Sequence, residues 1–227
     1  MSVNIVDKID DTVKVKNVLI SVSDKSHLDV LIEGLIMVNK DIKIYSTGGT
    51  YSKIKEILGD RHSNNLVSVS EYTGQPEMQG GLVKTLDFKI YLGLLSETYN
   101  EDHVNDIRKQ NAVIFDMVVV NLYPFQQTIA KEKVTIEEAR SNIDIGGPTM
   151  LRASAKNYLR VASVCNPSKY NNILKELTEN KGGLSFNTRF ELAKETFNHT
   201  AEYDKTISEF LVSYQGEEAI KSYTIIK

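Results

Sequence analysis

The chain has 227 residues, 41% of them hydrophobic and 25% charged, which suffices for one sizeable core but not comfortably for two independent domains. A formal net charge of −3 excludes the broad basic field that nucleic-acid or anionic-membrane binding needs, so we expect neither kind of partner. A single cysteine excludes an internal disulfide framework, and every apolar run is shorter than the ~20 residues of a membrane helix, which together favour the cytoplasm.

The N-terminal part of the chain predicts repeated strand–helix units. Residues 1–15 alternate in charge and are expected to form a solvated extension. Residues 17–22 predict a strand, and the apolar spacing at Leu28, Leu31, Ile32 and Leu35 predicts the helix that follows. Residues 42–46 predict a second strand. Thr50 is expected to cap the next helix, which runs through Leu58.

The middle of the chain contains the strand that the sequence predicts most clearly. Residues 66–69 predict a third strand, and residues 71–85 a long irregular connection of the kind that often has a function. An apolar segment at 90–95 and a polar helix around 102–109 come next. The nearly continuous apolar run at 115–122 is typical of a parallel strand buried on both faces.

The C-terminal part is predominantly helical. Pro124 begins a helix or turn, and Pro148 is expected at the first position of a helix. The pattern further predicts one buried strand, at 161–165, and helices at 136–141, 169–179 and 187–210. The domain is therefore expected to span residues 16–211, followed by a tail or linker stub at 212–227 whose apolar residues lack an evident partner.

Strands that alternate with helices predict an α/β fold, a three-layer parallel sheet with helices on both faces that binds ligands beyond the carboxyl ends of its strands. Small and polar residues gather in the expected loops at 21–25, 46–50, 121–124 and 142–147. Glycine-rich helix starts let backbone N–H groups approach an anion, so a phosphate group is the expected ligand. Any one of these loops alone could be an ordinary capped turn, and neither a phosphate-loop nor a dinucleotide-binding fingerprint is present.

Several reactive side chains are ambiguous when taken singly. Lys84 could be an ordinary solvated lysine. Tyr123 could cover the sheet edge with its hydroxyl in solvent, and Asp144 could be a carboxylate at the start of a helix. Arg152 and Lys156 share a helix face that could simply be solvated. The four histidines and the cysteine lack metal-ligand spacing, so no metal site is expected.

Taken together, seven segments in fixed order resemble the inosine-monophosphate cyclohydrolase domain of the bifunctional transformylase/cyclohydrolase of purine biosynthesis. They are residues 22–25, 46–50, 80–81 with 83–86, 121–125, 142–153, 155–157 and 197–204, so that the resemblance covers about residues 17–210. It implies a methylglyoxal-synthase-like fold that is usually assembled as a homodimer. It also implies a purine-pathway nucleotide as partner and closure of 5-formamidoimidazole-4-carboxamide ribonucleotide to inosine monophosphate, without any cofactor.

The resemblance also assigns residues to the site. The family's catalytic groups fall on Lys84, Tyr123, Asp144 and Lys156. Its nucleotide-holding positions fall on Ser21, Ser23, Lys25, Thr47, Gly48, Gly49, Thr50, Thr85, Asn121, Gly146 and Gly147. Lys156 lies eight residues beyond Pro148, about 12 Å along an unbroken helix, so it needs a short helix or a dimer partner to meet Asp144.

The chain departs from the family at one loop. Relatives generally read Gly-Gly-Arg-Val-Lys-Thr-Leu-His-Pro, whereas this chain has Leu82 for the arginine and Asp87-Phe88 for His-Pro. Loss of a charged donor is expected to weaken nucleotide binding. A non-catalytic nucleotide-binding module of the same fold is therefore the alternative, and a methylglyoxal-synthase-type reaction on a triose phosphate is a third reading that the loops favour less.

The segment after residue 212 bears on a second activity. Residues 213–227 are far fewer than a transformylase domain needs. We therefore expect no formyl transfer from this chain itself and a separate transformylase domain as a possible partner.

Overall fold

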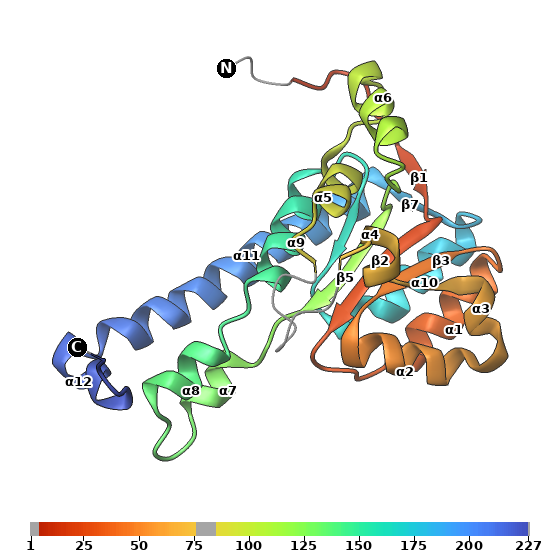
Figure 1. Cartoon of the computed structure of the whole chain (residues 1–227). Coiled ribbons are helices and arrows are strands. Elements are labelled where there is room, and N and C mark those ends of the chain that lie inside the picture. The colour runs from red at the N-terminus through yellow and green to blue at the C-terminus, as the bar shows by residue number, and fades with distance from the viewer. Residues whose placement is uncertain (1–4, 76–84, 227) are drawn as a thin grey trace.

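The computed structural model describes residues 5–75 and 85–226, which form a three-layer α/β fold (Figure 1). A parallel five-stranded sheet occupies the centre, and this architecture confirms the predicted fold class. Its strands in spatial order are β4 (Leu66–Ser68), β3 (Lys43–Ser46), β2 (Asn17–Val22), β5 (Met117–Asn121) and β6 (Ala162–Val164). The direction of strand order reverses at β2, so the carboxyl ends of β2 and β5 flank the crevice where ligands of such sheets bind.

Helices cover both faces of the sheet. The four apolar residues predicted to line one face of α1, Leu28, Leu31, Ile32 and Leu35, are all buried in the core. One face of the sheet is covered by α1 (Leu28–Val38), α2 (Gly48–Leu58) and α10 (Tyr170–Glu179). The other face is covered by α4 (Val69–Thr73), α5 (Phe88–Leu95) and α9 (Gly146–Lys156). The apolar segment predicted at 90–95 therefore belongs to α5, a helix that covers one face of the sheet.

A long helix extends beyond these layers. α11 (Phe186–Val212) has 27 residues, packs against α9 and β6, and then projects past the sheet (Figure 1). Its outer end meets a small lobe that contains α7 (Phe125–Ile129), α8 (Ile136–Ser141) and α12 (Gly216–Ala219). The other helices of the described residues are η1 (Gly59–Arg61), α3 (His62–Asn65), α6 (Glu101–Lys109), η3 (Pro167–Lys169) and η4 (Ile220–Ser222). Within residues 5–75 and 85–226, no helix has the length and apolar character that crossing a bilayer demands.

The N-terminal segment differs from the solvated extension expected for residues 1–15. β1 (Thr12–Lys14) pairs antiparallel with β7 (Gly183–Ser185), and Val15 is buried in the core. The buried guanidinium of Arg189 donates hydrogen bonds to the carbonyl oxygens of Asp10 and Asp11, at 2.8 and 3.2 Å. Residues 10–15 are thus held by a partner far along the chain, which local charge alternation cannot reveal.

Two helices begin earlier than the sequence predicts. α2 starts at Gly48 with Thr47 at the N-cap, and Pro148 is the third residue of α9. Thr50 is therefore no cap: its buried hydroxyl donates to the Val22 carbonyl oxygen at 3.0 Å and accepts the Val22 N–H at 3.1 Å. This side chain fastens the first turn of α2 to the end of β2.

Candidate functional site

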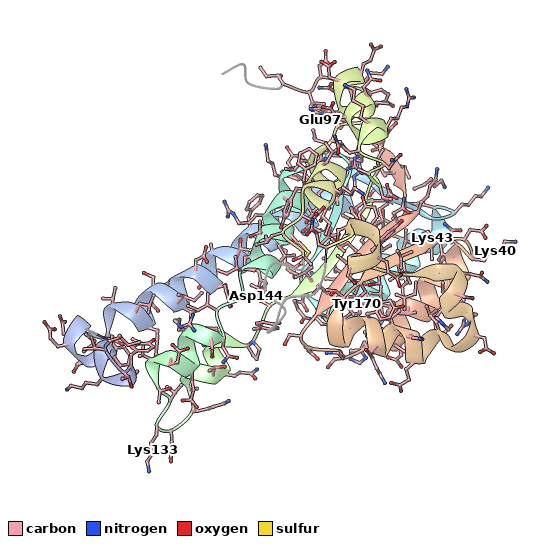
Figure 2. All side chains as sticks on the ribbon, in the orientation of Figure 1. Lys40, Lys43, Glu97, Lys133, Asp144 and Tyr170 are labelled. Atoms are coloured by element: carbon pink, nitrogen blue, oxygen red, sulfur yellow. The ribbon has the colours of Figure 1, made fainter. Side chains whose placement is uncertain are left out.

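A cavity of about 600 Å³ opens at the carboxyl edge of the sheet, between the ends of β2 and β5. The loops after β2, β3 and β5 form its walls, and the loop between α8 and α9 closes it together with Thr85. Figure 2 shows Asp144 near the middle of the molecule, where the projecting lobe meets the sheet, with Glu97 and Lys133 far away at opposite ends. The structure therefore joins loops that are more than 100 residues apart in sequence.

All eleven residues predicted to hold the nucleotide line this cavity, together with two of the four predicted catalytic residues. The eleven are Ser21, Ser23, Lys25, Thr47, Gly48, Gly49, Thr50, Thr85, Asn121, Gly146 and Gly147. The two catalytic candidates are Tyr123 and Asp144. Lys84 and Leu82 lie outside the described residues.

Asn121 holds the wall formed by the β2–α1 loop. Its Oδ1 accepts the backbone N–H groups of Ser23 and Asp24 at 2.6 and 2.8 Å, and its Nδ2 donates to the Asp24 carbonyl oxygen at 2.8 Å. Three hydrogen bonds from one amide fix this loop against the end of β5. The role visible in the structure is therefore to shape the cavity.

The opposite wall is the amino terminus of α2. Gly48 has φ 55°, a left-handed conformation in which any other residue type is strained. A β-carbon placed on Gly49 would lie 4.0 Å from the Lys25 Nζ, so an ammonium group sits beside the first turn of this helix. Unpaired N–H groups at a helix start and a neighbouring cation both favour an anion at this position.

The third wall, formed by Asp144 and the start of α9, permits only small residues. Asp144 Oδ1 accepts the Gly147 N–H at 2.8 Å. A β-carbon on Gly147 would lie 2.5 Å from Asp144 Oδ2, and one on Gly146 would lie 2.7 Å from the Thr85 hydroxyl. A side chain at either position would therefore force the Asp144 or Thr85 side chain out of its place in the wall.

The environment of Asp144 shifts its ionisation. Burial raises the pKa of the Asp144 carboxyl above its ordinary value of 3.8, and hydrogen bonds from the backbone N–H groups of Gly147 and Tyr123 partly offset this effect. Tyr123 itself is 52% exposed at the cavity wall, where a bound molecule can reach its ring and hydroxyl. A carboxyl of raised pKa beside an accessible phenol is suited to proton transfer.

Lys156 is not brought to the cavity of its own chain. It is the last residue of α9, whereas Gly146 at the cavity is the first, so ten residues of unbroken helix separate them by about 15 Å. Its side chain is exposed. A short helix would have allowed Lys156 to meet Asp144 within one chain, but α9 runs unbroken from Gly146 to Lys156.

The departures at residues 87 and 88 have a structural role. Asp87 is the N-cap of α5, and its Oδ1 accepts the Lys89 N–H at 2.8 Å. A capping carboxylate stabilises a helix start, which accounts for the negative charge at this position. Phe88 is 66% exposed, and neither side chain lines the cavity.

Sequence reasoning missed one polar group of the site. The Tyr203 hydroxyl, from α11, accepts the Asp144 N–H at 2.8 Å. The only available signal was its place in the 197–204 segment. Sequence analysis also missed the apolar lining of the cavity, which is contributed by Val22, Leu86, Val120, Ile143, Ile145 and Met150.

A second cavity, of about 420 Å³, lies at the amino edge of the sheet, and two of its buried polar residues, Arg160 and Asp116, bind backbone groups. Arg160 donates to the carbonyl oxygens of Phe115 and Gly93, both at 2.7 Å. Asp116 accepts the N–H groups of Lys16 and Asn17, and burial raises the pKa of its carboxyl. Both side chains thus hydrogen-bond to backbone groups of the protein itself. Within the described ranges, no cluster of His, Cys, Asp or Glu has the geometry to hold a metal ion.

Two family models match the chain. The MGS-like domain matches residues 31–149, which is more than half of the chain, and the AICARFT/IMPCHase bienzyme matches residues 154–226. The first match contains α2, β5 and the start of α9, and the second contains α11. The boundary between the two matches lies within α9.

Named relatives agree with these models. The bifunctional purine biosynthesis protein PurH of Ruminiclostridium cellulolyticum is 45% identical over 203 residues, which cover 89% of this chain and 38% of the relative. PurH of Bacillus subtilis is 41% identical over 211 residues, which cover 93% of this chain and 40% of the relative. The chain thus spans about two fifths of the length of the curated relatives it matches.

A solved structure supports the same assignment. The crystal structure of ForH superposes with a TM-score of 0.73 at 26% sequence identity, and the match covers 87% of this chain and 99% of that chain. Fold, family models and sequence identity therefore agree over nearly the whole described region. The chain belongs to the MGS-like domain family and is homologous to the bifunctional PurH proteins of purine biosynthesis.

Proposed function

We propose that this chain is an inosine-monophosphate cyclohydrolase, which closes the second ring of 5-formamidoimidazole-4-carboxamide ribonucleotide with loss of water. The observation that carries the proposal is the single cavity at the β2–β5 crevice. It gathers an anion-favouring helix start, an accessible phenol and a carboxyl of raised pKa within one ligand-sized space. Relatives named for purine biosynthesis support a purine nucleotide as the ligand.

The cavity suggests one orientation for this nucleotide. The 5′-phosphate would bind at the start of α2, where the helix amino terminus and the Lys25 ammonium both attract negative charge. The heterocycle would then reach the wall of Asp144, Gly146 and Tyr123. Apolar side chains such as Ile145 and Leu86 line the space between and suit a flat ring.

Ring closure needs two kinds of help at that wall. The carboxamide nitrogen attacks the formyl carbon, so a C–N bond forms, the nitrogen loses a proton and the formyl oxygen gains negative charge. That oxygen takes up the proton from the carboxamide nitrogen and a second proton from the formamido nitrogen, and it leaves as water as its C–O bond breaks and a C=N bond forms to the formamido nitrogen. Oxyanion stabilisation and proton transfer must therefore act together.

Roles follow from the chemistry of each group. Lys84 is assigned to proton transfer at the carboxamide, with Tyr123 as relay. Asp144 is assigned to the formyl oxygen and the departing water, because burial raises the pKa of its carboxyl and so makes it a better proton carrier than an ordinary aspartate. The amides of Gly146 and Gly147 are the oxyanion candidates. Because the Gly147 N–H already binds Asp144, Gly146 is the better of the two.

Lys156 requires a second copy of the chain. It lies about 15 Å along α9 from the cavity, so in this proposal it serves the cavity of a partner subunit in a homodimer. A solvated lysine on the helix face is the outcome if the chain is monomeric. Sedimentation of the pure chain, together with Lys156→Ala kinetics, tests both points at once.

The direct test mixes the purified chain with the formamido nucleotide and follows inosine monophosphate by its absorbance and by mass spectrometry. Formation of inosine monophosphate is expected, and it should be strongly slowed but still measurable in Asp144→Asn and unchanged in the remote control Tyr99→Phe. Binding of the nucleotide without turnover would favour the non-catalytic module of the same fold. Absence of both binding and turnover would overturn the proposal.

A further inference from the structure

The long helix α11 contacts Asp144 directly and reaches the loop of Tyr123 through Phe125. The Tyr203 hydroxyl accepts the backbone N–H of Asp144 at 2.8 Å. The same hydroxyl lies 3.5 Å from the Asn142 carbonyl oxygen, so it spans the loop that leads into α9. One side chain of α11 therefore fixes the backbone from which the Asp144 carboxyl projects.

The ring of Tyr203 also reaches the loop that carries Tyr123. It packs edge-on against Phe125 with ring centroids 6.3 Å apart, and Phe210, further along α11, packs on Phe125 at 5.8 Å. The Phe125 N–H in turn donates to the Tyr123 carbonyl oxygen at 2.8 Å. Two loops from different parts of the chain thus rest on one stretch of α11.

We propose that Tyr203 is a positioning residue for the reaction end of the cavity, and that it acts through Asp144. The inference rests on the proposed function and adds a residue that its mechanism does not contain. Small displacements of a reacting group are costly: a shift of about 1 Å can lower a rate on the order of a hundredfold. Tyr203 is not among the residues that line the cavity, so we expect it to act through Asp144 and not on the nucleotide itself.

The chemistry of the Tyr203 hydroxyl suits this role. Burial raises the pKa of the phenol, so the group stays neutral at working pH and can accept the Asp144 N–H without introducing charge. α11 lies in the segment matched by the AICARFT/IMPCHase bienzyme model, whereas Tyr123 and Asp144 lie in the MGS-like match. The contact therefore joins the general fold to a helix outside that match.

Tyr72 provides a matched control. Its hydroxyl accepts the Val113 N–H at 2.8 Å, burial raises its pKa in the same way, and it does not line the cavity. Tyr72→Phe thus removes an equivalent tyrosine–amide hydrogen bond elsewhere in the core. Differences between Tyr203→Phe and Tyr72→Phe report the place of the bond and not the loss of a hydroxyl.

The kinetic test is a double-mutant cycle on the full chain. Tyr203→Phe should lower kcat about tenfold with KM nearly unchanged, because it disturbs placement of the reacting carboxyl and not the phosphate end. In an Asp144→Asn background the same change should lower kcat less than about twofold, since its target is already removed. Tyr72→Phe should leave kcat near the wild-type value. Equal losses in both backgrounds, or a rise in KM alone, would overturn the proposal.

Amide hydrogen exchange of the unliganded chain separates this inference from the proposed function. Tyr203→Phe should speed exchange at Asp144 about tenfold or more and leave Val113 protected, and Tyr72→Phe should do the reverse. If the wild-type chain shows no turnover, the cyclohydrolase proposal fails while this contact is still tested. Unchanged exchange at Asp144 in Tyr203→Phe would overturn the positioning role by itself.

Discussion

Asn121 offers a measurable link between one side chain and the shape of the cavity. Asn121→Ala deletes the acceptor of two backbone N–H groups and the donor to the Asp24 carbonyl oxygen. Asn121→Asp keeps the acceptor but replaces that donor with a second oxygen facing the carbonyl. The two variants therefore separate loss of the whole clamp from loss of its donor alone.

The cost of Asn121→Ala follows from the exposure of each bond. The bond to the Ser23 N–H is partly buried and should contribute about 1 kcal/mol, whereas the two bonds to Asp24 are exposed and should contribute about 0.5 kcal/mol each. The free energy of unfolding should thus fall by about 2 kcal/mol. For a chain of this size, that corresponds to a Tm about 4 to 8 °C lower.

Differential scanning fluorimetry and calorimetric titration with inosine monophosphate provide the assays. Because the clamp shapes the wall beside Ser23 and Lys25, Asn121→Ala should also weaken nucleotide binding about tenfold. Asn157→Ala is the control: its Nδ2 donates to the carbonyl oxygens of Leu94 and Ser96 away from the cavity, so its Tm should fall while affinity stays. Wild-type affinity in Asn121→Ala would refute the reasoning, as would an equal loss of affinity in Asn157→Ala.

Three further predictions address the reaction end. Lys84→Ala and Tyr123→Phe should each lower kcat roughly tenfold or more with an unchanged Tm, because both remove proton-transfer groups and not core volume; near-normal rates in both would contradict the assignment. Leu82→Arg should tighten inosine monophosphate binding about tenfold by adding a charged donor, and titration showing equal or weaker affinity would exclude this. The third concerns pH: since the folded chain holds the Asp144 proton more tightly than the unfolded chain, the free energy of unfolding falls as pH rises from 3.8 through the raised pKa. Asp144→Asn removes this ionisation and keeps an acceptor, so its Tm at pH 7 should equal or exceed the wild-type Tm while kcat falls. The difference in Tm between the two proteins should narrow below pH 4. A variant Tm below the wild-type Tm at pH 7 would count against the raised pKa.

Local patterns in the sequence predicted the elements that their own residues stabilise. The apolar run that becomes β5 is buried on both faces, and the spacing of Leu28, Leu31, Ile32 and Leu35 marks the buried face of α1. Both signals arise because burial of alternate or helically spaced side chains is decided within a few residues. The family resemblance assigned eleven residues to nucleotide binding, and all eleven line the cavity, since parallel strands place their following loops at one edge of the sheet.

Details that depend on partners distant in sequence required the tertiary structure. Thr50 follows two glycines and looks like a cap, yet it binds Val22, 28 residues earlier. Residues 12–14 look solvated, yet they pair with β7 about 170 residues later. In each case a side chain or strand has several acceptable local states, and only a contact made in the folded chain selects one.

The sequence by itself determined the fold class and the loops at the carboxyl edge, from alternating strand and helix patterns, and the family, from its resemblance to the seven segments in fixed order. Only the tertiary structure decided that Tyr203 holds Asp144, that Asp87 caps α5 and that Lys156 lies a full helix away from the cavity. The physical reason is that distance along a chain is not distance in space. Hydrogen bonds and packing act over a few ångströms, and packing of the whole core sets which distant groups come that close.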